Sequence, residues 1–275
     1  MDILRIAAFS DGVHGGNPAG VVIGDSFPTE TEMRRIAAEV GFSETAFAAP
    51  LNGMWRVRYF SPESEVPFCG HATIALGAAL AQKFGNGVFQ LQLNNAQISV
   101  EGQRDGKVIA AALQSPPTRS EPISAELLSD TLKLFELTDG DLDRSIPPAI
   151  IHGGANHIVL ALKSRAALSA MKYDLDAGRT LMNRVGLITI LLVFAESKRL
   201  FHTRNAFASG GVYEDPATGA SSAAFAGYLR EIGWPHGGSI DIVQGEDMGM
   251  RSLIRADISE MLGASIRVSG TARVM

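Results

Sequence analysis

The stretch that decides the fold reads YEDPATGASS at residues 213–222, and AAFAGYL follows it directly at residues 223–229. Two acids and a proline precede Thr218 and Gly219, and large apolar residues then recur at helical spacing. This order predicts a helix that begins near Thr218. The first N–H groups of a helix lack partners within it and carry partial positive charge, so a carboxylate or enolate oxygen would bind well beside Asp215. An ordinary capped core helix is the alternative.

A second copy of this pattern lies earlier in the chain. GHATIALGAAL at residues 70–80 aligns without a gap with GASSAAFAGYL at residues 219–229, small residue against small and apolar against apolar. Each copy follows a segment that contains an arginine and a phenylalanine, at 58–62 and at 204–208, and then an acidic loop. The chain is therefore predicted to be duplicated. Two glycine-led helix starts facing one cleft would offer two sets of backbone donors to a single anion.

Length and composition describe a soluble enzyme of two domains. The chain has 275 residues, of which 46% are hydrophobic and 19% are charged, and the duplication favours two domains over one. A net charge of -5 repels a nucleic-acid backbone and an anionic membrane surface. We expect a small anionic molecule as the substrate, with no nucleic-acid partner and no membrane partner.

The single cysteine, Cys69, permits no disulfide within the chain and is typical of a reducing compartment. The first residues lack the basic and long apolar segments of a signal peptide. The longest apolar run, residues 185–195, is too short to cross a bilayer and is typical of a buried strand. These features predict a cytoplasmic protein.

Glu44 stands out within a predicted strand over residues 42–48. Apolar residues alternate along this strand, and Glu44 falls on the same side as Phe42 and Ala46. A carboxylate on an inward face costs free energy unless it is paired or its pKa is raised. The alternation therefore indicates a functional carboxylate. A glutamate at a strand edge that faces solvent is the other interpretation, because short strands bulge and alternation can slip.

The remaining pattern mixes strands and helices. A linker is predicted at residues 115–122, where prolines cluster, and one helical stretch at residues 165–183. The halves are expected to comprise residues 1–116 and residues 117–264. The terminal strand at about 265–275 is a candidate to join the first half.

Standard cofactor motifs are absent from the sequence. No Gly-x-Gly-x-x-Gly follows a strand, no Gly-Lys-Ser/Thr loop occurs, and the histidines show no His-x-x-x-His spacing, so we expect no metal and no organic cofactor. Cys69 beside His71 suggests a thiol nucleophile, although a small buried hydrophobe is the more frequent role. Ser221 and Ser222 suggest a serine hydrolase, but the chain lacks the Gly-x-Ser-x-Gly elbow, which favours a structural role.

Four motifs resemble the PhzF-like proteins, a family named for an isomerase of phenazine biosynthesis. They are GNP at 16–18, SET at 43–45, PFCGHAT at 67–73 and EDPATG at 214–219, and they occur in the family's order. The resemblance implies an α/β (α+β) fold of two pseudo-symmetric halves, as in diaminopimelate epimerase. Each half would be a curved, mostly antiparallel sheet wrapped around a central helix, with the active site between the halves.

The same resemblance implies roles for individual residues. Glu44 would act as general base and then acid, while His71 and Asp215 would position the substrate or relay the proton. No metal or organic cofactor would take part, and the protein would form a homodimer. The residues expected to bind substrate are Asn17, Pro18, Gly70, Thr218, Gly219, Ala220 and Ser221.

The chain also departs from its relatives at two points. Ala220 stands where the phenazine enzyme has a serine, which removes a side-chain hydroxyl contact but leaves the backbone contacts. Epimerases of this fold use two opposed cysteines, and Cys69 has no counterpart in the second half, which excludes a two-thiol racemase. We expect a cofactor-independent isomerase that moves a proton and a double bond by carboxylate acid/base catalysis in the interdomain cleft. The alternatives are a noncatalytic metabolite-binding or interaction protein, and a lyase or hydratase using the same base.

Overall fold

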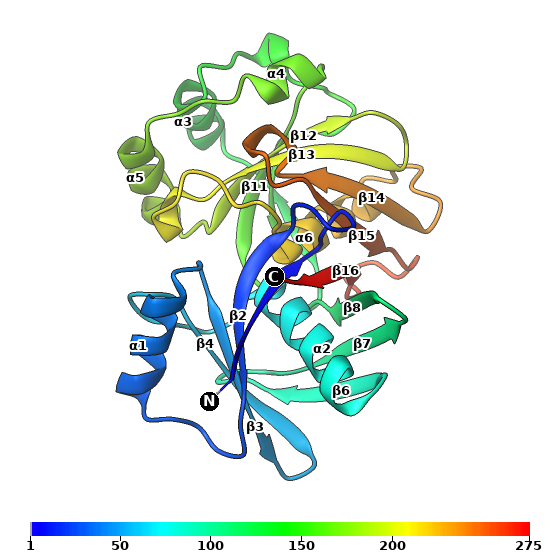
Figure 1. The fold of residues 1–275 in the computed structure, drawn as a ribbon. Coiled ribbons are helices and arrows are strands. Elements are labelled where there is room, and N and C mark those ends of the chain that lie inside the picture. Colours follow the sequence, from blue (N-terminus) through cyan, green and yellow to red (C-terminus); the bar gives the residue numbers. More distant parts are fainter. Residues whose placement is uncertain (1) are drawn as a thin grey trace. The chain divides into compact units, whose positions relative to one another are not determined.

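The computed structural model describes residues 2–275 and separates the chain into two compact units. The first extends to Gln114 and includes Ser269–Met275, and the second comprises Ser115–Val268. Each unit is a mostly antiparallel sheet that packs against one buried helix, α2 (Gly70–Phe84) in the first and α6 (Gly219–Glu231) in the second (Figure 1). The predicted fold class is confirmed, and both central helices begin at the predicted glycines.

In the first unit the strand order is β1-β2-β3-β4-β6-β7-β8, and the short β5 pairs with β4. The last strand, β16, is next to β8 in the sheet and also pairs with β1, so the strands close into a ring. α2 contacts β1, β2, β3, β6, β7 and β8 and therefore fills this ring. The elements are β1 (Ile3–Ala8), β2 (Asn17–Ile23), α1 (Glu30–Val40), β3 (Thr45–Leu51), β4 (Met54–Phe60), β5 (Glu65–Val66), β6 (Gly87–Gln92), β7 (Gln97–Asp105), β8 (Val108–Gln114) and β16 (Arg267–Val274).

In the second unit the strand order is β9-β10-β11-β12-β13-β14-β15. α6 contacts β9, β10, β11 and β15, which places it against one face of this sheet. The elements are β9 (Arg119–Pro122), α3 (Ala125–Leu134), β10 (Ala149–His152), β11 (Asn156–Ala161), α4 (Arg165–Ser169), α5 (Leu175–Val185), β12 (Thr189–Ala195), β13 (Leu200–Ala206), β14 (Ser239–Gln244) and β15 (Ser252–Asp257).

The two sheets repeat one pattern of strand directions. From β1 to β6 the pairings run antiparallel, parallel, antiparallel and parallel. From β10 to β14 they run in the same sequence. In both units the central helix follows the fourth strand of this series. The duplication predicted from residues 70–80 and 219–229 is therefore confirmed at the level of topology.

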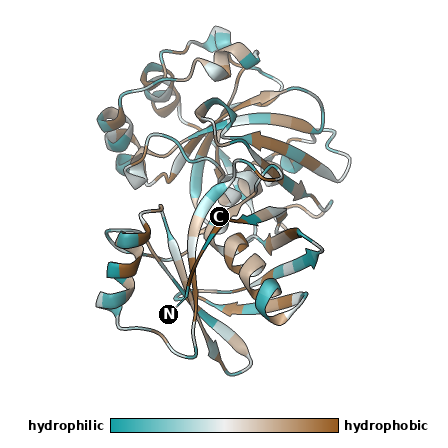
Figure 2. Ribbon diagram, viewed as in Figure 1, coloured by the Kyte–Doolittle hydropathy of each residue, from teal (hydrophilic) through white to brown (hydrophobic). Residues whose placement is uncertain are grey.

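Small residues let each sheet close tightly around its helix. A Cβ added to Gly102 of β7 would lie 2.2 Å from the carbonyl oxygen of Gly77 in α2, and a Cβ on Gly227 of α6 would lie 2.3 Å from Thr118 Oγ1. Helices that are apolar on all sides are buried, whereas amphipathic ones lie at the surface. α1 is of the second kind, and its ribbon carries both hydrophilic and hydrophobic segments in Figure 2. Among residues 2–275 the structure contains no helix with the length and hydropathy required to cross a membrane.

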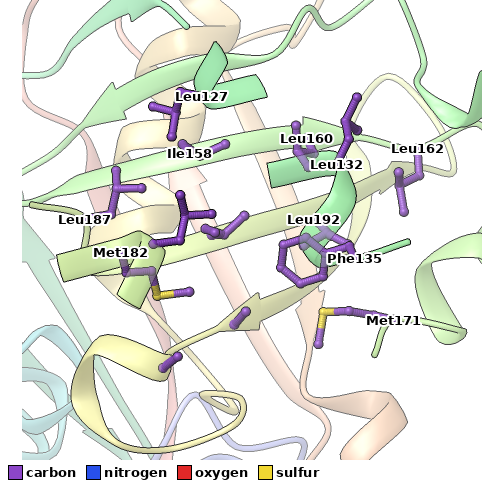
Figure 3. Close-up of a cluster of buried hydrophobic side chains, with 14 of the residues drawn as sticks. Leu127, Leu132, Phe135, Ile158, Leu160, Leu162, Met171, Met182, Leu187 and Leu192 are labelled. Carbon is purple, nitrogen blue, oxygen red and sulfur yellow. The ribbon is translucent and has the colours of Figure 1, made fainter. Parts of the chain in front are cut away.

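The other face of the second sheet carries its own hydrophobic core (Figure 3). Ile158 and Leu160 of β11 and Leu192 of β12 lie beneath α3 and α5 and contact a cluster of leucine, methionine and phenylalanine side chains. Since alternate residues of a strand point to opposite faces, the intervening residues of β11 face α6. Burial on both faces explains why β11 and β12 read as nearly continuous apolar runs.

Two predictions about connections in the second unit were correct only in part. The proline-rich linker predicted at residues 115–122 holds for residues 115–118, where the boundary between the units falls. Residues 119–122 form β9, which pairs antiparallel with β10, and Pro122 is tolerated because β9 is an edge strand. The helical stretch predicted at residues 165–183 is two helices, α4 and α5. Each has its own N-cap, Ser164 and Asp174, whose side-chain oxygens accept a bond from the first turn and so favour two separate helix starts.

Candidate functional site

Glu44 lies at the entrance to β3, and it is buried. The strand predicted over residues 42–48 begins only at Thr45, so Glu44 belongs to the connection from α1. The predicted alternation does not place it, because Thr45–Ala49 are buried on both faces of the strand. Its backbone oxygen accepts a bond of 3.1 Å from Gly20 N in β2. Glu44 itself is 9% exposed. Its predicted burial is therefore confirmed, although its local structure differs from the predicted one.

His71, in the first turn of α2, lies against Glu44. Its Nε2 is 3.4 Å from Glu44 Oε2, and its Nδ1 is 3.4 Å from Cys69 Sγ. Ser43 Oγ also lies 3.4 Å from His71 Nε2. The imidazole ring thus has the carboxylate and a hydroxyl on one nitrogen and the thiol on the other. A protonated His71 would pair with ionised Glu44 at this distance.

One carboxylate oxygen of Glu44 lacks a hydrogen-bond donor. Glu44 Oε2 is buried and makes no hydrogen bond of acceptable geometry to any residue between 2 and 275; the 3.4 Å approach of His71 satisfies a distance for an ion pair only. A buried carboxylate oxygen without a donor is costly. Such a group is suited to accept a proton from a ligand that reaches it.

In the second unit, Asp215 is held in a turn just before α6. The hydroxyl of Thr218 donates to Asp215 Oδ2. Gln244, at the end of β14, donates through Nε2 to the Asp215 carbonyl at 2.7 Å and to Thr218 Oγ1 at 3.1 Å. Its Oε1 accepts from Thr218 N at 3.3 Å. Gln244 therefore fixes the backbone that carries both predicted site residues.

Ser221 is engaged in bonds within the same unit. Asn205 Nδ2 of β13 donates to Ser221 Oγ at 2.9 Å, and Ser221 Oγ donates to the Thr218 carbonyl at 3.2 Å. The Asn205 carbonyl accepts from Asp215 N at 3.0 Å. These contacts hold the Ser221 side chain at the start of α6, and its contact with substrate stays a prediction. The backbone N–H groups of Gly219 and Ala220 are unaffected by them.

The two central helices differ from the outer ones at the N-cap, the residue just before the helix. Cys69 and Thr218, the N-caps of α2 and α6, make no side-chain bond to the helix start. The outer helices α1, α3, α4 and α5 are all capped by a side-chain oxygen, from Thr29, Ser124, Ser164 and Asp174. An uncapped helix start leaves N–H donors and a positive partial charge for another acceptor. Gly70 and His71 in α2, like Gly219 and Ala220 in α6, are placed to present such donors.

Asn17 and Pro18 begin β2 in the unit that contains Glu44. They pair with Ala8 and Ala7 of β1, and Asn17 is buried. β2 also pairs in parallel with β3 directly after Glu44, at Gly20 and Thr45. The sheet thus ties the predicted substrate-binding pair to the strand that Glu44 precedes.

A buried ion pair holds the residue before Asp215. Arg204 of β13 donates through Nε to Glu214 Oε1 at 3.0 Å and through Nη2 to Oε2 at 2.5 Å. Its Nη1 donates to the carbonyls of Ser169 and Met171. The guanidinium is therefore satisfied on several sides, as a buried charge requires. This pair restricts the position of the Glu214–Asp215 peptide.

Sequence reasoning missed Ser43, Asn205 and Gln244 as site residues. Asn205 and Gln244 are polar residues at or near the ends of strands that are otherwise mostly apolar and buried. That signal was available, because a buried amide needs partners. The partners of these amides could not be predicted from the sequence. The parallel pairing of β13 with β14, which places Gln244 beside Thr203, is known only from the structure.

Comparison with known proteins covers nearly the whole chain. Residues 6–275 match the family model described as phenazine biosynthesis-like protein. A trans-2,3-dihydro-3-hydroxyanthranilate isomerase of Pseudomonas chlororaphis is 31% identical, with 91% of this chain and 88% of the relative covered. An uncharacterized isomerase of Escherichia coli O157:H7 is 28% identical, covering 99% of this chain and 96% of the relative.

The fold has a close match among solved structures. The PhzF-family phenazine biosynthesis protein of Bacillus anthracis superposes with a TM-score of 0.87 at 21% identity, covering 99% of this chain and 96% of that chain. The fold is thus shared with a protein of very different sequence.

Proposed function

The chain belongs to the phenazine biosynthesis-like family and is an isomerase, and we propose that it moves a proton, and with it a double bond, on a small anionic metabolite. In this proposal Glu44 is the base that removes the proton and the acid that returns it. The reaction as proposed uses no metal and no organic cofactor.

The observation that carries the proposal is the unpartnered oxygen of Glu44. Glu44 Oε2 is buried and has no hydrogen-bond donor among residues 2–275, yet His71 Nε2 lies only 3.4 Å away. A buried carboxylate oxygen that no donor occupies is free to contact a C–H group of a ligand and to receive its proton. The nearby imidazole supplies a second group that can hold a proton or contact the substrate.

The proposed steps conserve every electron pair. Glu44 takes a proton from a carbon next to an unsaturated group, and the C–H bonding pair becomes a new double bond while the charge moves onto an oxygen. The protonated Glu44 then returns the proton to a different carbon, which shifts the double bond. Helix N–H groups stabilise an oxygen on which negative charge develops, and the uncapped start of α2 carries such donors beside His71.

The substrate class follows from the donors and from one relative. Uncapped helix starts favour an anion such as a carboxylate, and both α2 and α6 have this feature. The Pseudomonas chlororaphis relative is named for its action on trans-2,3-dihydro-3-hydroxyanthranilate. We therefore place this compound, with other small unsaturated carboxylic acids, in the first panel of test substrates. Asp215 is proposed to contact the substrate or relay the proton.

The test is proton exchange at carbon. The protein is incubated in D2O with the panel, and loss of C–H signals is followed by NMR for wild type and Glu44→Gln. Glu63→Gln is the matched control, because Glu63 lies on an exposed loop of the same unit. We expect exchange in wild type and Glu63→Gln, and loss of exchange in Glu44→Gln.

Other outcomes separate the rival functions. Tight binding of a panel compound without exchange in any variant would favour a noncatalytic binding protein. A product that differs from its substrate by the mass of water would favour a lyase or hydratase that uses the same base.

A further inference from the structure

We propose that Glu44, Cys69 and His71 bind a zinc ion. The ion would coordinate the carboxylate of Glu44, the proposed catalytic base, and so inhibit the enzyme. Within residues 2–275 these three side chains come together in one place, and one donor atom of each lies within 4.8 Å of the others. All three residues are buried. The inhibition rests on the proposed function, whereas the binding itself does not.

The distances suit one ion. His71 Nε2 lies 3.4 Å from Glu44 Oε2 and 3.9 Å from Cys69 Sγ. In a tetrahedral zinc site, with Zn–S near 2.3 Å and Zn–N or Zn–O near 2.0–2.1 Å, neighbouring ligand atoms are roughly 3.3–3.6 Å apart. Cys69 Sγ lies closer to His71 Nδ1, at 3.4 Å, so the Cys69 side chain would turn toward Nε2 to share one metal ion with Glu44. The fourth position would be left for water or a ligand.

The donor types indicate which ion would bind. A thiolate, an imidazole and a carboxylate together favour zinc over magnesium or calcium, which prefer oxygen ligands alone. On binding, the thiol gives its proton to solvent and the sulfur ligates as thiolate. Zinc would also supply the missing partner for Glu44 Oε2.

This site belongs to one half of the duplicated chain. The helix-start residues Cys69 and His71 have Thr218 and Ala220 as their counterparts in the aligned second half. β3 and β12 are equivalent strands, and their parallel pairings with the preceding strands begin at Thr45 and Thr189. Glu44 is therefore matched by Ile188. The second half offers none of these three donors at the equivalent positions, so one ion per chain is expected.

The proposal is tested with cobalt(II) as a spectroscopic probe. Cobalt bound by a thiolate gives a charge-transfer absorption band in the near ultraviolet. Because Cys69 is the only cysteine in the chain, such a band would identify Cys69 as a ligand of the metal. Wild type, Cys69→Ser, His71→Asn, Glu44→Gln and the exposed control His14→Ala are titrated with cobalt, and zinc is then added to displace it. Circular dichroism and thermal melting establish that every variant is folded.

We expect a saturable band at one cobalt per chain in wild type and His14→Ala, which zinc abolishes. Cys69→Ser should lose the band, while His71→Asn and Glu44→Gln should each weaken zinc binding at least about tenfold, because losing a ligand should cost no less than losing a hydrogen-bond partner of a ligand. Absence of the band in wild type, or equal zinc affinity in wild type and all three site variants, would overturn the proposal.

A separate measurement addresses inhibition. Zinc added to the exchange assay in D2O should stop exchange by wild type, and a chelator should restore it. Active wild type that stays fully active when titration shows zinc bound would refute the inhibitory role. Failure of the isomerase proposal would instead appear as absence of exchange before any zinc is added, with the cobalt band unaffected.

Discussion

The two halves of the chain share a scaffold but differ in the groups they carry at equivalent positions. Both have the same order of strand directions and a buried helix whose N-cap side chain makes no capping bond. The first half places Glu44 and His71 at positions where the second has Ile188 and Ala220. Duplication has therefore preserved the frame, while ionisable side chains suited to proton transfer occur at these positions in one half only.

An arginine–glutamate pair is among the preserved features. Arg58 lies two residues before Phe60, which pairs with Glu65, and Arg204 lies two residues before Ala206, which pairs with Glu214. Both arginines bond their glutamate through Nε and Nη2. The pairs differ in burial, because the side chains of the first are each 21% exposed and those of the second are 9% and 3% exposed. The same interaction therefore contributes differently to stability in the two halves.

Removing the arginines should show this difference most strongly. Arg204→Met leaves Glu214 buried without its partner, and we expect a loss of about 3–5 kcal/mol in the free energy of unfolding. Arg58→Met leaves Glu65 near solvent and still bonded to Asn94, so about 1 kcal/mol or less is expected. Urea unfolding of both variants measures the two losses, and equal losses would contradict the comparison.

The imidazole of the first half should matter for activity. His71→Asn removes the ring that lies 3.4 Å from Glu44, and we expect the exchange rate to fall about 10²-fold, the lower range for a group that assists proton transfer. Ala220→Ser, at the equivalent position in the second half, keeps the backbone donors and should change the rate far less. Rates for both variants come from NMR in D2O. A larger fall in exchange rate for Ala220→Ser than for His71→Asn would contradict the assignment of proton transfer to the first half.

Adding a methyl group at a tightly packed glycine should destabilise the two central helices to a similar extent. A Cβ at Gly77 would lie 2.5 Å from Val100 Cγ2, and one at Gly227 would lie 2.3 Å from Thr118 Oγ1. Since overpacking a core costs about 1–3 kcal/mol, Gly77→Ala and Gly227→Ala should both destabilise by amounts in this range. Gly87→Ala is the matched control, because its Cβ would meet only Phe89 at 3.9 Å. Thermal melting compares the three, and a stability unchanged by either central substitution would argue against close packing there.

A buried histidine should make the second half sensitive to acid. His157 is buried and bonds Thr189 Oγ1 at 2.6 Å, whereas Gly20 stands at the equivalent place in the first half. Burial lowers the pKa of His157 to about 3. Because the folded pKa lies below the unfolded value near 6.5, the unfolded state binds more protons between these values, and stability falls as pH falls below about 6.5.

The expected slope for this group approaches about 1.4 kcal/mol per pH unit. His157→Gln should remove that slope, even if it lowers stability at neutral pH, and urea unfolding at several pH values between about 7 and about 4.5 measures it. An unchanged slope in His157→Gln would assign the acid sensitivity to other groups.

Much of the frame could be predicted from sequence because it depends on local patterns. Small and apolar residues at helical spacing predicted both central helices and their first residues, Gly70 and Gly219. The alignment of the two helices predicted the duplication. β9 was missed because proline normally signals a linker, and only pairing with β10 makes that edge strand visible.

The site was harder to predict, because its contacts join distant parts of the chain. Burial of Glu44 was predicted from the alternation of apolar residues along a strand over residues 42–48. In the structure that strand begins at Thr45, one residue after Glu44, so Glu44 is buried although the alternation does not explain it. Cys69 was expected to be a small buried residue and is buried, but its approach to His71 depends on side-chain orientation. The bond between Ser221 and Asn205 of β13 joins residues 16 positions apart and could not be foreseen from local patterns.

The most direct test of the central claim compares equivalent positions in the two halves. The rate of C–H exchange in D2O is measured by NMR for wild type, Glu44→Gln and Ile188→Ala with any compound on which wild type acts. We predict a fall of about 10²–10⁴-fold for Glu44→Gln, the usual contribution of a general base, and little change for the half-exposed Ile188→Ala. Exchange by Glu44→Gln at the wild-type rate would contradict the account, because the proton would then be removed by another group.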